Sequence, residues 1–237
     1  MVAQVQPLTG DGPCSDIELA SAIAAGDHDA FRTLMRQHNR LLYRTARSIV
    51  KDDSDAEDAV QNAYLLAYRK IGNFRAEAKL STWLVRIVVN EALECLRKRS
   101  RSAHVISLDG RELDDAIESA AEPMNRKPER PEEQLIRADT RRLIESKIDE
   151  LPSVYRAVFM LRAVEEFSVE ETAVALGVPE ATVRTRSFRA RALLREALSG
   201  DADMALDTAF PFAGARCAGI VARVMAIIAS EADALAV

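Results

Sequence analysis

Five arginines lie close together near the end of this sequence, in the short run from Arg184 to Arg195, which holds no acidic residue. The chain as a whole is acidic, with a formal net charge of −5. Clustered guanidinium groups are well suited to phosphate oxygens, so this local excess of positive charge predicts contact with nucleic acid. The alternative is a basic helix face that is simply solvated.

Residues that could hold a metal or act as nucleophiles are few and scattered. The cysteines and histidines are Cys14, Cys95, Cys217, His28, His38 and His104. None shows metal-ligand or redox spacing, so we expect no metal, no cofactor and reduced thiols. Cys217 is interpreted as a buried residue, with a sensor thiol as the alternative. No nucleophile with its base and no phosphate-binding glycine loop is recognisable, so we expect no enzyme activity and no small-molecule substrate.

Neither the N-terminus nor the most apolar run of the chain has the pattern of a targeting signal or membrane span. Residues 1–14 lack the basic start and apolar centre of a signal peptide and are expected to be disordered. The most apolar run, "CAGIVARVMAIIA", is short and contains Arg223, so it should not span a bilayer. Both observations favour a cytoplasmic protein that is not itself a membrane protein.

Helix-forming residues dominate the composition and predict an all-α fold. Helical spacing of apolar residues predicts one small bundle over residues 15–101, whose last helix ends near Arg99, and a second over 132–199. Residues 102–131 are acidic, contain several prolines and are expected to form a flexible linker. The bundles are therefore expected to fold separately, with a loosely fixed relative placement. Residues 200–237 are expected to form an apolar tail helix.

The elements that position the arginines have the pattern of a helix-turn-helix. Ser168 and Glu171 form a capping box, Gly177 allows a sharp turn, and Pro179 suits the first turn of the next helix. In such a motif the second helix enters the major groove of DNA. The side chains expected to contact DNA are Thr182, Arg184, Thr185, Arg186, Phe188, Arg189 and Arg191.

The stretches "DAEDAVQNAYLLAYRKI", "FRAEAKLSTWLVRIVVNEALECLRKRSR" and "LPSVYRAVFMLRAVEEFSVEETAVALGVPEATVRTRSFRARALLR" follow one another in this chain. In order and spacing they resemble the extracytoplasmic-function sigma factors, the two-domain class of the sigma-70 family. The resemblance implies a factor that binds core RNA polymerase and directs promoter recognition, melting and transcription initiation. It also implies an anti-sigma partner. The arginine-rich helix would then read the minus-thirty-five element.

The resemblance assigns two further surfaces in the first bundle. One helix face would dock on polymerase through Asp58, Gln61, Leu65 and Tyr68, although a solvated polar face is equally consistent with the spacing. A second surface would bind and melt the minus-ten element through Phe74, Lys79, Trp83, Arg86, Asn90, Arg97, Lys98, Arg99 and Arg101. For Trp83, packing in the core is the alternative to stacking on bases.

Two other functions remain open at this point. A helix-turn-helix regulator acting without polymerase would bind duplex DNA alone, and it would leave Asp58, Gln61 and the Trp83 helix without a role. A sigma mimic that titrates an anti-sigma factor would need neither the arginines of residues 184–195 nor the basic run "RKRSR".

Overall fold

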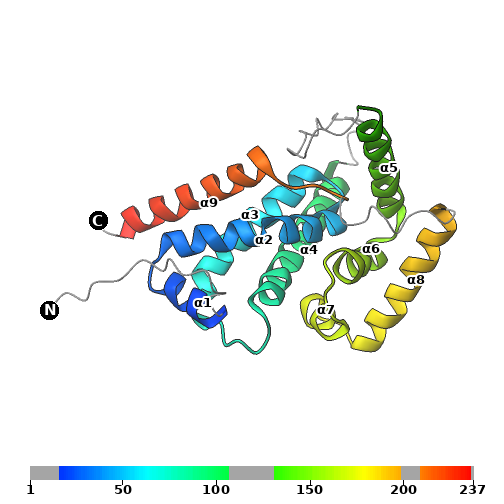
Figure 1. The fold of residues 1–237 in the computed structure, drawn as a ribbon. Coiled ribbons are helices and arrows are strands. Elements are labelled where there is room, and N and C mark those ends of the chain that lie inside the picture. Colours follow the sequence, from blue (N-terminus) through cyan, green and yellow to red (C-terminus); the bar gives the residue numbers. More distant parts are fainter. Residues whose placement is uncertain (1–15, 107–130, 199–208, 236–237) are drawn as a thin grey trace.

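A computed structural model describes residues 16–106, 131–198 and 209–235. Every regular element in this described part is helical, as the composition predicts. Figure 1 shows the arrangement. The elements are α1 (Asp16–Ala24), α2 (His28–Val50), α3 (Asp53–Lys70), a short 3₁₀ turn η1 (Ile71–Asn73), α4 (Leu80–Ile106), α5 (Pro131–Glu150), α6 (Ser153–Phe159), a π-helical turn η2 (Met160–Val164), α7 (Val169–Leu176), α8 (Glu180–Leu198) and α9 (Gly214–Leu235).

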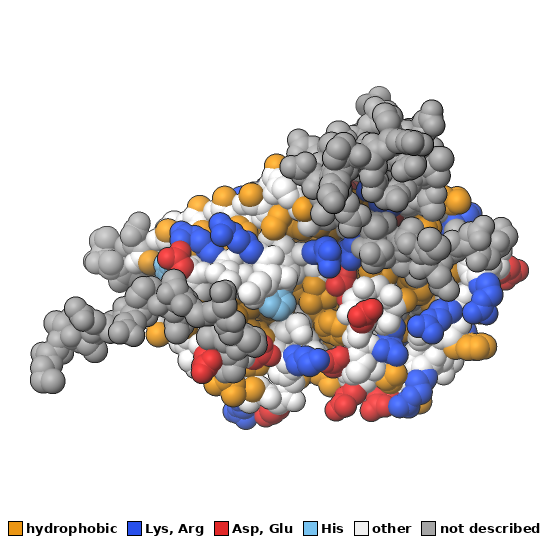
Figure 2. Space-filling model, in the orientation of Figure 1, with side chains coloured by type: hydrophobic (Ala, Val, Ile, Leu, Met, Phe, Trp, Pro, Cys, Tyr) orange, Lys and Arg blue, Asp and Glu red, His pale blue; other side chains and the backbone are white. Residues whose placement is uncertain are grey.

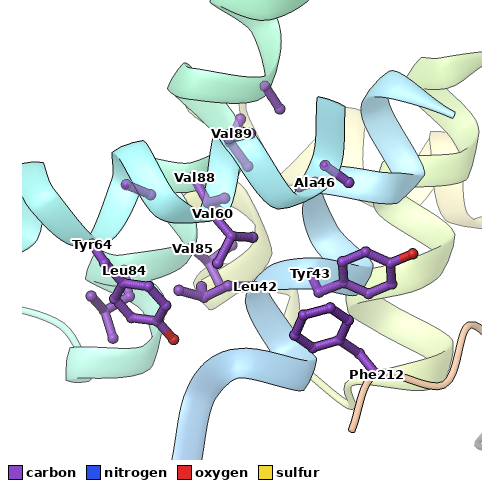
Figure 3. Packing of buried hydrophobic residues seen from close by; sticks show 14 of the residues in the cluster. Leu42, Tyr43, Ala46, Val60, Tyr64, Leu84, Val85, Val88, Val89 and Phe212 are labelled. Atoms are coloured by element: carbon purple, nitrogen blue, oxygen red, sulfur yellow. The ribbon is translucent and has the colours of Figure 1, made fainter. Parts of the chain in front are cut away.

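Helices α1 to α4 form the first bundle, in which small residues let the helices approach closely. Helical spacing assigns one apolar face of α3 to an alanine stripe, Ala56, Ala59, Ala63 and Ala67, with Val60. This face is buried against α2 and α4, and Figure 3 shows Val60 among side chains of both neighbours. Asp27 caps α2, with its carboxylate accepting from the backbone N–H groups of Asp29 and Ala30, both at 2.9 Å. The preceding Gly26 has a φ of +92°, which a side chain would strain.

Two helix boundaries in this bundle are set by nearby residues, and the second differs from the prediction. Helix α3 begins at Asp53, because Asp52 accepts from the Asp55 amide at 2.8 Å and so acts as the N-cap. Helix α4 continues to Ile106 instead of ending near Arg99. The residues that follow Arg99 contain no glycine or proline before Gly110, so no strong helix breaker stops it earlier. The rest of the expected linker, from residue 107 to 130, lies outside the described residues, as do residues 1–15.

Helices α5 to α8 form the second bundle, which contains the helix-turn-helix. The capping box is present in both directions: the Ser168 amide donates to Glu171 Oε2 at 2.7 Å, and the Glu171 amide donates to Ser168 Oγ at 3.0 Å. Gly177 turns the chain with a φ of +64°. Helical spacing predicts that Val183, Ser187, Ala190 and Leu194 of α8 face inward; Ser187 is half-buried and the other three are buried. The local sequence signals of this motif are therefore confirmed.

The two bundles pack on each other, contrary to the expected loose placement. Helix α7 lies against α4, and α6 lies against α2. Ion pairs join the two bundles. Arg44 pairs with Glu165 at 2.9 Å, and Arg47 donates to both carboxylate oxygens of Asp149, at 3.0 and 2.8 Å. These buried or half-buried pairs, together with a continuous apolar core, hold the bundles in a defined arrangement. We call it the closed arrangement.

The tail helix α9 packs along α2 and α3 (Figure 1). Its predicted apolar residues Ile220, Val221, Val224 and Ile228 are buried, whereas Ile227 is half-exposed. In the described part of the chain, none of the helices combines the length and apolarity that crossing a bilayer requires.

Candidate DNA-binding and polymerase-binding surfaces

The outward face of α8 is an exposed strip of cations around one apolar ring. Arg184, Thr185 and Arg189 are exposed, and Phe188 leaves 76% of its surface accessible. Arg191 is also exposed, while Thr182 and Arg186 are half-buried. Figure 2 shows the basic side chains along the side of the molecule that α8 occupies in Figure 1. Each of the seven predicted side chains is thus at least partly accessible.

One arginine of this strip has an acidic partner from the preceding turn of α8. No acid occurs between Arg184 and Arg195, but Glu180, one turn earlier, pairs with Arg184 at 2.6 Å. The pair is exposed on both sides, so solvent screens it and it contributes little to stability. A phosphate could therefore replace Glu180 as the partner of Arg184 at small cost.

A hollow of about 400 Å³ opens beside the first half of α8. Val154 and Tyr155 of α6 form one wall, and Ala181, Thr182, Thr185, Arg186 and Arg189 form the other. Arg189 donates to the Tyr155 hydroxyl at 3.3 Å, across the hollow from α8 to α6. Sequence reasoning did not select Tyr155 as a site residue. A tyrosine on the helix that precedes the helix-turn-helix was the available signal.

The second candidate surface follows the start of α4 and the loop before it. Phe74 and Trp83 form an edge-to-face pair with ring centroids 5.7 Å apart, and both are half-buried. Arg86 and Asn90 are exposed on the same helix. Trp83 therefore lies between the two predicted environments, with part of its ring on the core and part open.

The basic end of α4 is exposed and partly paired. Arg97, Lys98 and Arg99 are all exposed. Arg99 pairs with Asp55 at 3.1 Å, and Arg97 pairs with Glu94 of its own helix at 3.3 Å. Arg101 lies within α4, but its side chain is outside the described part of the structure.

Lys79 joins this surface to the helix-turn-helix. Its ammonium lies 2.7 Å from Glu171 Oε1, the capping residue of α7. The hydrogen bond from Lys79 and that from the Ser168 amide lower the pKa of Glu171 below its ordinary value. In the closed arrangement, one of the predicted minus-ten residues is therefore occupied by the other bundle.

The third candidate surface is the outer face of α3. Asp58 is exposed, while Gln61, Leu65 and Tyr68 are half-buried. Tyr68 packs on Phe31 with centroids 5.1 Å apart, so it is partly a packing residue. The face borders α9, because Glu57, one turn before Gln61, pairs with Arg216 at 2.6 Å.

Sequence reasoning missed the arginines between the bundles. Arg44 is buried in α2, in the stretch "LLYRTARSIV", where it falls among apolar residues on the inward side of the helix. A charged residue at such a position needs a buried partner, which was the available signal.

Family comparisons match both bundles separately. Residues 34–102 match the model of sigma-70 region 2, and residues 141–194 match the model of sigma-70, region 4. The chain is 37% identical over 184 residues to the ECF RNA polymerase sigma factor SigM of Mycobacterium tuberculosis, covering 78% of this chain and 85% of that one. It is 30% identical over 178 residues to the ECF RNA polymerase sigma-E factor of Escherichia coli, covering 75% and 91%.

Solved structures agree with this fold. The chain is similar to CnrH, solved in complex with the cytosolic domain of CnrY, with a TM-score of 0.53 and 27% identity over 78% of this chain and 98% of that one. The fold is also that of the sigma factor RpoE, solved with the anti-sigma factor NepR from Bartonella quintana, with a TM-score of 0.54 and 24% identity over 76% and 99%. Together with the two matched regions, the sequence relatives show that this chain belongs to the extracytoplasmic-function sigma factors of the sigma-70 family.

Proposed function

We propose that this chain binds core RNA polymerase and directs it to promoters through the three surfaces described above. The outer face of α3 docks on polymerase. The loop before α4, with Phe74 and Trp83, binds and melts the minus-ten element, and α8 reads the minus-thirty-five element. The observation that carries the proposal is α8, where Phe188 is widely exposed between arginines on a helix set by a helix-turn-helix.

The composition of α8 suits reading as well as binding. Arginines on both sides of a helix can contact phosphates on the two walls of a groove, which fixes its orientation. Thr185 and Phe188 lie between them, where a methyl group and a ring can contact base edges such as the thymine methyl.

Each bundle has its own role in this proposal. Residues 15–101 serve as the polymerase-binding and minus-ten domain, residues 132–199 as the minus-thirty-five domain, and residues 102–131 as the connection between them. The protein acts in the cytoplasm as a polymerase subunit without catalytic chemistry of its own. An anti-sigma factor is its expected regulator, since CnrH and RpoE were each solved with a binding partner.

Transcription in vitro tests this proposal. Core polymerase is supplied with the full chain and a library of genomic fragments, and run-off products are sequenced. Products should require both components, and the paired change Arg186→Ala with Arg189→Ala should reduce them. The matched control is Arg36→Ala, which removes an exposed arginine from α2.

Other outcomes identify the rival functions. Tight duplex binding by the chain alone, with no dependence on polymerase, would show a regulator that acts without polymerase. Capture of an anti-sigma factor with no transcript from any fragment would show a sigma mimic.

A further inference from the structure

The segment just before α9 contacts both bundles at once. The Phe210 amide donates to Glu145 Oε1 of α5 at 2.7 Å. The Phe210 carbonyl accepts from Arg44 Nε of α2 at 3.2 Å. The Arg47 guanidinium lies over the Phe210 ring, 5.1 Å from its centroid. Phe210 therefore links the second bundle to the first through its own backbone and ring.

Phe210 lies where the charged pairs cross the boundary between the bundles. Arg44 and Arg47, which hold Phe210, are also the residues that bind Glu165 and Asp149 of the second bundle. Only 7% of the Phe210 surface is exposed, and the neighbouring Ala209 is fully buried. Withdrawing this segment would remove the Phe210 ring from Arg47 and the Phe210 backbone contacts from both bundles.

Helix α9 anchors the segment on the first bundle. Phe212 stacks on Tyr43 with centroids 4.1 Å apart, as Figure 3 shows. Arg216 then pairs with Glu57 at 2.6 Å and with Asp53 at 3.3 Å, both in α3 of the first bundle. Beyond it, the apolar face of α9 is buried on α2 and α3, and Arg223 adds a second contact to Glu57 at 3.3 Å.

The closed arrangement is incompatible with reading two promoter elements together. Elements centred near positions −10 and −35 are separated by about 25 base pairs, or roughly 85 Å at about 3.4 Å per base pair. In the structure α7 of the helix-turn-helix lies directly on α4, and Lys79 is paired with Glu171. The bundles must therefore separate before both elements can be bound.

We propose that residues 209–235 form an internal staple that stabilises the closed arrangement and so restrains the chain until polymerase binds. Helix α9 remains on the first bundle as the anchor, and the contacts of Phe210 with Glu145 are the ones that break on opening. The tail lies outside both matched regions. Its role as a restraint rests on the proposed polymerase function.

Substitutions that leave the chain length unchanged test the staple. The variant Phe210→Ala with Arg216→Ala removes the ring on Arg47 and the two ion pairs that Arg216 makes with Asp53 and Glu57. Small-angle X-ray scattering of the full chain should show a larger radius of gyration for this variant. Its affinity for core polymerase should rise by about tenfold, because a larger fraction of the chain is open and competent to bind. The control is Ala226→Ser, at an exposed position of α9.

A chain truncated after Leu198 provides the second arm, and circular dichroism checks that each variant keeps its helices. Unchanged scattering and unchanged affinity in the double variant would overturn the staple. Should the truncated chain aggregate, the single change Glu145→Ala, which removes the acceptor of the Phe210 amide and leaves α9 in place, decides by the same two measurements. If no form binds core polymerase, the proposed function fails, and the scattering alone then decides whether the tail closes the chain.

Discussion

Arg156 of the second bundle donates to the backbone carbonyl of Ser48 in the last turn of α2, although 108 residues separate them. The guanidinium also reaches the carbonyls of Ile49, Asp149 and Leu151, at 3.3, 3.0 and 2.9 Å. Its surface is only 1% exposed. One cation therefore satisfies the C-terminal ends of two helices, α2 and α5, which would otherwise leave carbonyl groups without partners at the boundary.

Replacing Arg156 with alanine should lower the free energy of unfolding by roughly 2–4 kcal/mol, because several buried carbonyls lose a charged donor. Thermal and urea unfolding measure the change. Arg142→Ala, at an exposed position of α5, is the control and should change stability by less than about 0.5 kcal/mol. Equal stability of the two variants would show that water replaces Arg156 without cost.

The outer face of α3 should fail to bind polymerase when its charge is reversed. Asp58→Lys with Gln61→Lys is expected to weaken binding to core polymerase by roughly tenfold or more, with helix content unchanged, because Asp58 is exposed and Gln61 is half-buried. Co-purification and a binding titration measure it, with Gln37→Lys on α2 as the control. Normal assembly of the double variant would remove this face from the polymerase contact.

The salt dependence of promoter binding should show whether the arginines of α8 contact phosphates or bases. If Arg184 and Arg189 bind phosphates, each alanine substitution should weaken promoter binding by the holoenzyme on all sequences and reduce the salt slope by about one. A base contact would instead change the preferred sequence. Variants that transcribe like the parent at every salt concentration would mean that α8 has only a solvated basic face.

Acid should weaken the contact between α4 and α7. The pKa of Glu171 is lowered by Lys79 and by the Ser168 amide, so its contribution to stability is present above the ordinary pKa of a glutamate, about 4.3, and is lost as the pH falls below it. Unfolding measured between pH 3 and 6 should therefore show a smaller loss in Glu171→Gln than in the parent. Identical pH profiles would contradict this.

Cutting the segment from residue 102 to 131 should not by itself part the two bundles. We expect a protease to cut first between Ser102 and Pro131 and to yield two stable fragments. Since Arg44 and Arg47 hold Glu165 and Asp149 across the boundary, the fragments should elute together in gel filtration until salt or denaturant is added. A chain that resists cleavage between Ser102 and Pro131 would favour a single protected core.

Local signals in the sequence predicted the elements well, and contacts between distant segments were not predictable in the same way. The capping box of Ser168 and the turn at Gly177 depend on a few adjacent residues, so spacing alone identifies them. Arg156 and Phe210 take their roles from partners more than sixty residues away, which no periodicity reveals. The packing of the two bundles on each other was not predicted for this reason.

The three predicted surfaces show the same division. The face of α8 followed from helical spacing, and its side chains are accessible as expected. The ion pair between Lys79 and Glu171 could not be predicted from helical spacing, because it forms only when the second bundle packs on the first. Sequence periodicity therefore identifies a face, while the packing of the whole chain decides whether that face is available.

Because of the alanine stripe, the buried side of α3 should tolerate fewer substitutions than its exposed side. Ala56, Ala59, Ala63 and Ala67 expose at most 2% of their surface between α2 and α4, so a larger side chain at any of them must push two helices apart. Positions on the opposite side, such as Asp58 and Asn62, are exposed and carry no such constraint. Drift in sequence along α3 should thus be confined to the outer side, where changes in partner preference can accumulate without loss of the fold.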